Sequence, residues 1–174
     1  MASNDALIGE KAPGISGRLA LGHGLIKLRK LMVELEYERD ESGKFKEVNG
    51  KYVLKIKRNV VVLNFFSTTC IPCVREIPTY NKIAEKFKDK PVKLIYVNVD
   101  SNVNPLEIRR FLARKRIKVP MMLPNQRDAI KKYNAYALPR LVIINKNGKV
   151  ERVISGFSES LEEELTQLIE NLSR

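Results

Sequence analysis

The sequence is poor in the residues that build metal sites: its 174 residues include two cysteines, one histidine and no tryptophan. A structural zinc site usually takes four Cys or His ligands, and His23 lies far upstream of both cysteines, so a zinc site of the usual kind is excluded. No apolar run approaches the roughly 20 residues that span a bilayer. There is no internal repeat or low-complexity tract. With 44% hydrophobic and 30% charged residues, the composition is that of one ordinary globular domain.

A secretory signal peptide is also missing from the first residues of the sequence. The segment Met1–Asp5 has neither the positively charged region nor the apolar region of such a signal. A single CxxC pair is compatible with oxidising and with reducing compartments. Two locations therefore stay open: the cytoplasm, or the periplasm or outer face of a membrane for a chain whose targeting segment has been removed.

Both cysteines fall in one motif, Cys70-Ile71-Pro72-Cys73, which follows the pattern of a buried strand. The run Val60–Phe66 is almost wholly apolar, and from Ile71 onward the apolar residues recur with a helical period. We therefore expect Cys70 at the first turn of a helix, where unpaired backbone N–H groups and the helix dipole stabilise a thiolate. In such motifs the cysteine pKa falls from about 8.5 to roughly 3.5–7. Pro72 fits there because a first-turn proline loses only an N–H group without a helical partner.

Redox chemistry explains this motif better than a structural disulfide does. A bridge between residues so close in sequence removes little conformational entropy from the unfolded chain, so it would stabilise the fold only slightly. Two thiols at the start of a helix that follows a strand are typical of a pair that exchanges electrons. The sequence therefore predicts a redox-active Cys70–Cys73 disulfide.

Strand and helix patterns alternate downstream of the motif, which predicts parallel strands joined by right-handed crossovers. We expect strands at Val92–Val99, Leu141–Ile144 and Val150–Ile154, and further helices beginning near Asn104, Gln126 and Ser160. Asn147-Gly148 predicts a hairpin turn between the last two strands. Asn104 is expected to cap its helix, and Ser160 is expected to form a capping box with Glu163.

The first 59 residues are expected to form an N-terminal extension. Glycines recur between Ile8 and Ile26, which indicates irregular chain packed against the body. The alternating segment Val33–Glu38, a turn at Asp40–Gly43 and the segment Tyr52–Ile56 predict a β-hairpin packed on the sheet. Within a single domain, residues 1–59 are thus assigned to the extension and residues 60–174 to the main fold.

The segment Asn64–Pro78 resembles the active-site segment of thioredoxin-fold proteins, specifically of the TlpA/ResA type found outside the bacterial cytoplasm. The likeness extends over residues 60–174, and Gly9–Pro13 is similar to the opening of that family. The resemblance implies an α/β thioredoxin fold, a central mixed β-sheet flanked by helices, with an N-terminal β-hairpin extension. It also implies a thiol-disulfide oxidoreductase that acts on protein substrates, as a reductase of exported proteins such as apocytochrome c.

The same resemblance implies roles for individual residues. Cys70 would be the exposed nucleophile, and Cys73 the buried thiol that resolves the mixed disulfide. Glu76 matches the family's acid that tunes the thiols and relays a proton, whereas by pattern alone a helical Glu is usually a solvated surface residue. Pro139 matches the cis proline that faces the disulfide, and the backbone of Leu138 would pair with an extended substrate segment.

Four further positions complete the site that the resemblance implies. Ile71 and Pro72, between the cysteines, are expected to contact the substrate. Pro78 matches the proline that kinks the first helix. Asn64 stands where cytoplasmic thioredoxin has a buried Asp, and this difference points to the exported subgroup.

The sequence departs from the family pattern in two places. Phe66 and Thr69 occupy positions where the family commonly has tryptophan, so the apolar wall beside the thiols is altered. The stretch Arg18–Arg58 is longer and more basic than the usual short strand pair, which suggests an insertion.

Positive charge is in excess, with a formal net charge of +12, and much of it lies between Glu107 and Lys132. Nucleic acid is not an expected partner, because interleaved stacking aromatics and a recognition motif are missing. A solvated helix face is the favoured interpretation, followed by attraction to acidic partners or to anionic lipid headgroups at a membrane surface. The expected partners are protein thiols or disulfides and an upstream electron donor, with the chain acting as a monomer.

The predicted chemistry requires no organic cofactor and no metal, because the disulfide itself carries the electrons. Two alternatives stay open. A peroxiredoxin-type thiol peroxidase shares the fold, but its reactive Cys usually follows a nearby Pro, and none precedes Cys70 at that distance. A copper carrier usually has three residues between its cysteines and a later His, whereas this chain has two residues between them and no His after Cys73.

Overall fold

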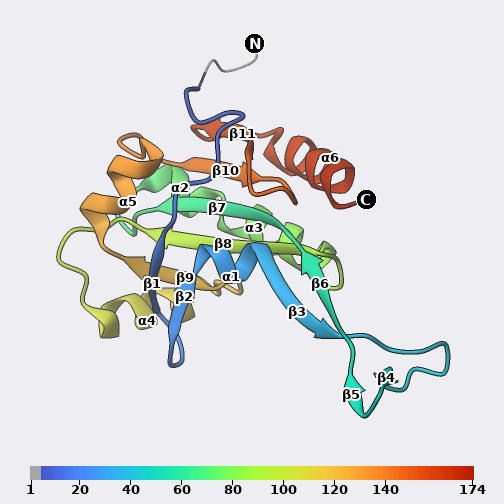
Figure 1. Ribbon diagram of the computed structural model, residues 1–174. Helices are drawn as coiled ribbons and strands as arrows, with labels where there is room; N and C mark the ends of the chain where they lie inside the picture. The colour runs from blue at the N-terminus through green and yellow to red at the C-terminus, as the bar shows by residue number, and fades with distance from the viewer. Residues whose placement is uncertain (1–4) are drawn as a thin grey trace.

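The centre of the fold is a seven-stranded sheet with the strand order β11-β10-β7-β8-β9-β1-β2 (Figure 1). The computed structural model describes residues 5–174; residues 1–4, most of the segment that lacks signal-peptide features, lie outside the described part. The strands of this sheet are β1 (Ser16–Leu19), β2 (Leu25–Lys27), β7 (Val60–Phe66), β8 (Val92–Asn98), β9 (Met121–Pro124), β10 (Arg140–Ile144) and β11 (Val150–Ser155). The helices are α1 (Leu28–Met32), α2 (Ile71–Arg75), α3 (Ile77–Lys86), α4 (Pro105–Arg114), α5 (Gln126–Tyr133) and α6 (Leu161–Ser173).

The sheet is mixed, as the α/β prediction required. β7 pairs in parallel with β8, and β8 in parallel with β9, while β10, β11, β1 and β2 join by antiparallel pairs. Every residue of β7 is buried, because its run of Val, Leu and Phe suits a strand that is covered on both faces. The central strand thus ends in the buried interior immediately before the cysteine motif.

Helices cover both faces of the sheet, so the chain has two apolar cores. Side chains alternate along β7: Val62 and Phe66 lie in the core shared with α3, α4 and α6, whereas Leu63 and Phe65 lie in the core shared with α1 and α5. The cysteine motif and Ile77 belong to the first of these cores. No helix within residues 5–174 combines the length and the apolar character that crossing a membrane requires.

One of the predicted helix caps is wrong. Asn104 caps α4 as predicted, since its side chain accepts a hydrogen bond from the Leu106 N–H at 3.0 Å. Ser160 precedes α6, but its φ of −84° and ψ of 1° are not the extended conformation of a capping residue, and its side chain makes no cap bond. Its hydroxyl donates instead to Glu164 at 2.8 Å, so the capping box with Glu163 does not form.

The expectation of irregular chain between Ile8 and Ile26 is wrong for β1 and for the start of β2, whereas most of the chain before β1 is irregular as expected. β1 pairs antiparallel with β9 and extends the main sheet, and β2 pairs with β1. The close approach depends on Gly17, because a Cβ there would lie 2.4 Å from the Leu123 carbonyl oxygen of β9. Gly17 therefore marks a close contact between strands that sequence reasoning took for irregular chain, whereas Gly9, Gly22 and Gly24 have positive φ values outside the strands.

The predicted N-terminal hairpin is present, and we call residues 33–58 the arm. β3 (Val33–Tyr37) pairs antiparallel with β6 (Leu54–Arg58), and β4 (Glu47–Val48) pairs with β5 (Lys51–Tyr52) near the tip. Figure 1 shows the arm projecting away from the main sheet. The expected packing on the sheet is thus limited to the base of the arm, where Lys93 of β8 forms an ion pair with Glu34 at 2.9 Å.

Candidate active site

The cysteine pair lies at the junction of β7 and α2, and the two thiols differ in accessibility. Cys70 is the N-cap residue of α2 and is partly exposed, whereas Cys73 is 1% exposed. The two form a disulfide with a Cα–Cα distance of 5.3 Å. The Cys73 N–H donates to the Cys70 sulfur at 3.3 Å, so a backbone donor is already aimed at the accessible sulfur. This donor would stabilise a Cys70 thiolate after reduction.

The helix after the motif is interrupted, and the interruption positions Glu76. α2 ends at Arg75 and α3 begins at Ile77, with Pro78 in its first turn. A proline within a continuous helix would clash with the carbonyl group four residues earlier, so the break falls just before it. Glu76 occupies the break and is 1% exposed, which the pattern of an ordinary surface helix does not predict.

The carboxyl group of Glu76 is buried without compensation. Neither of its oxygens has a hydrogen-bond partner within the described residues. Burial raises the pKa of Glu76 from 4.5 to about 7, because the low-dielectric interior disfavours the charged form. A carboxyl group with such a pKa can both hold and release a proton near neutrality, one helical turn from Cys73.

Leu138 and Pro139 precede β10 on the same side of the fold. The peptide bond between them is cis, Pro139 is buried, and its carbonyl oxygen accepts from the Gly156 N–H at 2.9 Å. Leu138 is partly exposed and, like Cys70, packs against the core that contains Cys73. The segment is therefore fixed in place while Leu138 stays within reach of solvent.

The remaining predicted site residues lie close by in the chain but in different surroundings. Ile71 is 75% exposed and Pro72 is partly exposed, so both are accessible beside Cys70. Asn64 is 1% exposed in β7, and its amide oxygen has no partner among the described residues. Of the two positions where the family commonly has tryptophan, Thr69 is exposed, whereas Phe66 is fully buried and contacts the rings of other core residues.

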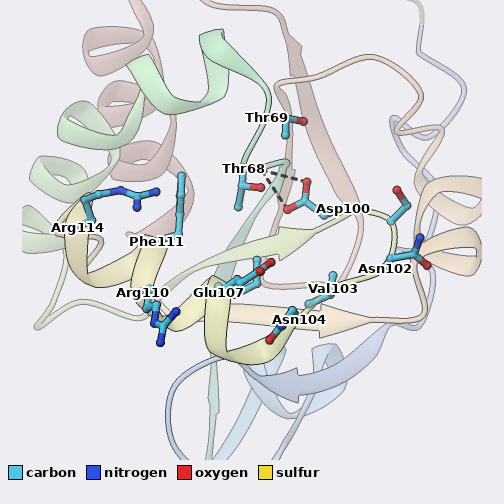
Figure 2. A pocket seen from close by; sticks show the side chains of 12 residues that line it. Thr68, Thr69, Asp100, Asn102, Val103, Asn104, Glu107, Arg110, Phe111 and Arg114 are labelled. Atoms are coloured by element: carbon cyan, nitrogen blue, oxygen red, sulfur yellow. Dashed lines mark hydrogen bonds between the residues drawn. The ribbon is translucent and has the colours of Figure 1, made fainter.

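Sequence reasoning missed Asp100, which anchors the turn before Cys70. Its carboxylate accepts from the Ser67 hydroxyl, from the Thr68 N–H at 3.1 Å and from the Asn98 side chain at 2.9 Å. Figure 2 shows Asp100 beside Thr68 and Thr69 at the wall of a cavity of about 530 Å³ that reaches α4. The signal for it was the polar pair Asn98 and Asp100 after an apolar strand, since polar side chains at the carboxyl end of a parallel strand gather near a site.

Sequence reasoning also missed Arg140 and Tyr96. Arg140 is 5% exposed at the start of β10, where it donates to the Tyr133 carbonyl at 2.8 Å and pairs with Asp5 at 2.9 Å. Tyr96 lies within an apolar strand and looked like an ordinary core residue. His23, in contrast, lies exposed in a loop, and the basic side chains of α4 are exposed to solvent, as the favoured interpretation of the basic segment predicts.

The sheet has this topology, a CxxC disulfide follows its central strand β7, and a cis proline precedes the neighbouring strand β10. Together these features define a thioredoxin-fold thiol-disulfide oxidoreductase. The chain belongs to the AhpC/TSA family, whose sequence profile matches residues 32–153. The predicted likeness to ResA is confirmed. ResA of Halalkalibacterium halodurans, a thiol-disulfide oxidoreductase, is 32% identical over 136 residues, which cover 78% of this chain and 72% of the relative.

Further relatives agree with this assignment. ResA of Bacillus subtilis is 30% identical over 126 residues, covering 71% of this chain and 69% of the relative. The thioredoxin domain of a thiol-disulfide oxidoreductase from Bacteroides vulgatus superposes with a TM-score of 0.71 at 17% identity, covering 98% of this chain and 100% of that domain. A thioredoxin family protein from Chlorobium tepidum gives a TM-score of 0.68 at 18% identity, with 99% and 100% covered. These structural likenesses establish the fold.

Proposed function

We propose that this oxidoreductase reduces disulfides in exported proteins, apocytochrome c among them, and works outside the cytoplasm. The observation that supports this most directly is the asymmetry of the pair, a partly exposed Cys70 bonded to a Cys73 that is 1% exposed. An accessible thiolate can attack a substrate, whereas a buried thiol can only complete the exchange. The ResA relatives, which are thiol-disulfide oxidoreductases, support the same activity.

The reaction begins with the reduced pair. The Cys70 thiolate attacks one sulfur of a substrate disulfide, a new S–S bond forms, and the other substrate sulfur leaves as a thiolate that takes a proton from water. Cys73 then loses its proton, attacks the Cys70 sulfur and releases the second substrate thiolate. The substrate gains two electrons and the enzyme ends as the Cys70–Cys73 disulfide. A dithiol electron donor restores the reduced pair by the reverse exchange.

Glu76 accepts the proton from Cys73 in the resolving step. Its pKa of about 7 makes it a base that is neither always charged nor always neutral at physiological pH. Leu138 and Pro139 form one wall of the substrate groove, and Ile71 and Pro72 form the other. The electrons pass through the disulfide alone, so we propose that neither a metal nor an organic cofactor takes part. The exposed basic surface of α4 would favour acidic partners or a membrane surface.

A pair of single-cysteine variants tests this function. Cys73→Ser should hold substrates as mixed disulfides on Cys70, because the resolving thiol is missing, whereas Cys70→Ser, its matched control, should capture none. The wild-type chain should reduce insulin disulfides with dithiothreitol as donor. Equal capture by both variants would contradict the assignment of nucleophile and resolving thiol.

The same preparation separates the alternatives. Rapid peroxide consumption without insulin reduction would favour a thiol peroxidase, and tight Cu(I) binding without insulin reduction would favour a copper carrier. Capture of exported c-type apocytochromes by Cys73→Ser in periplasmic extract, competed by an apocytochrome peptide that contains its CxxCH disulfide, would support the substrate. Failure of that peptide to be reduced would exclude it while leaving the general activity intact.

A further inference from the structure

Among the described residues, one buried hydroxyl group has no hydrogen-bond partner. Of three fully buried tyrosines, Tyr80 donates its hydroxyl to the Val62 carbonyl at 3.1 Å and Tyr133 donates to the Pro13 carbonyl at 2.5 Å. The hydroxyl of Tyr96 on β8 is buried and has no partner within residues 5–174. A buried polar group left unpaired loses its hydrogen bonds to water without replacement, so its retention calls for a partner in another state of the protein.

Two other unpaired polar groups lie in the same core. Tyr96 pairs in register with Asn64 of the neighbouring strand β7, and the side chain of Tyr96 lies in the core formed with α3. The amide oxygen of Asn64 and both carboxyl oxygens of Glu76 are the other buried groups near it without a partner in the described part of the chain. Together the three unpaired groups offer enough hydrogen-bond donors and acceptors to hold a shared proton or a bridging water next to the redox centre.

Glu76 and Tyr96 both lie beside Tyr80, whose backbone N–H donates to the Glu76 carbonyl oxygen at 2.9 Å. Burial, and then the negative charge of Glu76, raise the pKa of Tyr96, and the same charge contributes to the raised pKa of Tyr80. The rings of Tyr80 and Tyr96 have centroids 4.8 Å apart. The phenol of Tyr96 therefore keeps its proton at physiological pH and is available only as a hydrogen-bond donor to Glu76.

Within residues 5–174 the Glu76 carboxyl group has no ion-pair partner, and the charged side chains of α2, α3, α4 and α6 are exposed. The four glutamates of α6 and the three arginines of α4 are all exposed to solvent. Arg75 at the end of α2 stacks on the Phe157 ring, with 4.6 Å between the guanidinium carbon and the ring centroid. The titratable groups that remain around Glu76 are Cys73, one helical turn before it, Tyr80, one turn after it, and Tyr96.

We propose that Tyr96 is a positioning residue for the resolving step: its hydroxyl donates a hydrogen bond, directly or through one buried water, to the Glu76 carboxylate. The inference rests on the proposed role of Glu76 as proton acceptor. In the resting disulfide form Glu76 is partly protonated and Tyr96 is unpaired. The carboxylate that must be present before Cys73 gives up its proton is the form that Tyr96 stabilises, so the hydroxyl keeps Glu76 ionised at neutral pH.

Matched Tyr→Phe variants test this proposal, because each removes one hydroxyl and keeps the ring. The measured quantity is the rate at which Cys73 resolves a mixed disulfide on Cys70, followed from pH 5 to pH 9. In the wild type the rate should rise with an inflection that reports the Glu76 pKa, which the Tyr96 hydrogen bond lowers from the value of about 7 that burial alone gives. Tyr96→Phe should move the inflection up by about one pH unit, which is about a tenfold slower rate below the inflection. Tyr80→Phe, whose hydroxyl is already bound to a carbonyl group, should leave the inflection in place.

A direct titration keeps the two claims apart. When the ¹³C chemical shift of the Glu76 carboxyl carbon is followed against pH, its midpoint should move upward by the same amount in Tyr96→Phe. This measurement does not depend on the exchange reaction. If Glu76→Gln abolishes the inflection but Tyr96→Phe leaves it unmoved, the role of Tyr96 is overturned and the proposed function stands. If Glu76→Gln retains the inflection, the proton-acceptor role of Glu76 fails and the role of Tyr96 fails with it.

Discussion

The core around Glu76 and the arm at residues 33–58 invert the usual distribution of polar and apolar side chains in opposite ways. In the core, Glu76 and Asn64 are 1% exposed, and the Glu76 carboxyl group and the Asn64 amide oxygen have no hydrogen-bond partner among the described residues. On the arm, Leu35 and Ile56 face each other across the strand pair and are 66% and 60% exposed. Burial gives the core its chemistry, whereas the arm keeps a regular strand pattern without a core of its own.

The two regions also differ in how they treat charge. The carboxylate of Glu36 on the arm forms an ion pair with Lys57 at 2.9 Å, and both side chains remain partly exposed. Such a pair contributes little to stability, because water already solvates both groups. The carboxyl group of Glu76 has no ion-pair partner in the described part of the chain, and burial raises its pKa to about 7. The surroundings of Glu76, rather than its residue type, therefore set its pKa.

The largest expected effect comes from one substitution made in both regions. Phe66→Ala removes a fully buried ring, so it should lower the free energy of unfolding by about 3–5 kcal/mol. Phe45→Ala on the arm removes a ring that is 47% exposed, and it should cost about 1 kcal/mol or less. Urea unfolding monitored by circular dichroism measures both. Equal losses would show that the arm has a core that its exposure conceals.

A smaller effect should appear in the pH dependence of stability. The folded protein holds the Glu76 proton up to about pH 7, whereas the unfolded chain releases it near 4.5, so stability falls as the pH rises between these values. The 2.5-unit difference between the two pKa values corresponds to about 3 kcal/mol, fully lost above pH 7. In urea titrations from pH 4 to pH 8, Glu76→Gln should lack this decline. Glu163→Gln, at an exposed position of α6, should keep it.

Asp100 offers an intermediate test at the margin of the site. Asp100→Ala leaves the Thr68 N–H and the Ser67 hydroxyl without their acceptor, so it should cost about 1–3 kcal/mol. Because this turn leads directly into Cys70, insulin reduction should slow as well. Asp128→Ala breaks an exposed ion pair with Lys132 and should cost 1 kcal/mol or less, with no change in rate. An unchanged rate in Asp100→Ala would mean that the turn does not position the cysteine.

The smallest effect is expected from shortening the arm. Replacing residues 38–53 by Asn-Gly joins Tyr37 to Leu54 through a two-residue hairpin turn, which suits their register. The reduction of insulin should stay within about twofold, because the arm contributes no residue to the site, and the unfolding free energy should change by about 0.5 kcal/mol, as for surface changes. A large loss of activity would make the arm part of the substrate-binding surface.

Local patterns were sufficient where a structural element determines its own conformation. The apolar run before Cys70, the cap at Asn104 and the alternating segments of the hairpin each carry their signal within a few residues, and all three form as predicted. The fold class followed from their order and from the family resemblance. The location of the cysteine pair followed from the same local signals.

The pattern was insufficient where tertiary contacts decide the outcome. β1 becomes a strand only because it pairs with β9. Gly17 allows the close approach of the two strands, but a single glycine in the sequence does not predict it. The periodicity of β8 does not show that Tyr96 lies next to the core around Glu76, nor that Asp100, just after β8, anchors the turn before Cys70. Sequence reasoning therefore identified neither residue. Ser160 shows the same limit for caps, since a suitable residue type does not fix the backbone conformation that capping needs.

The close contact at Gly17 also protects a sheet edge through which the protein could aggregate. Without β1, the backbone N–H and C=O groups of β9 would form an open sheet border that could recruit a strand from another molecule. With β1 in place, the border moves to β2, which has three residues and includes Lys27, and the opposite border at β11 carries the exposed Glu151 and Arg152. Any larger side chain at position 17 would thus expose the chain to aggregation before it affected the redox chemistry.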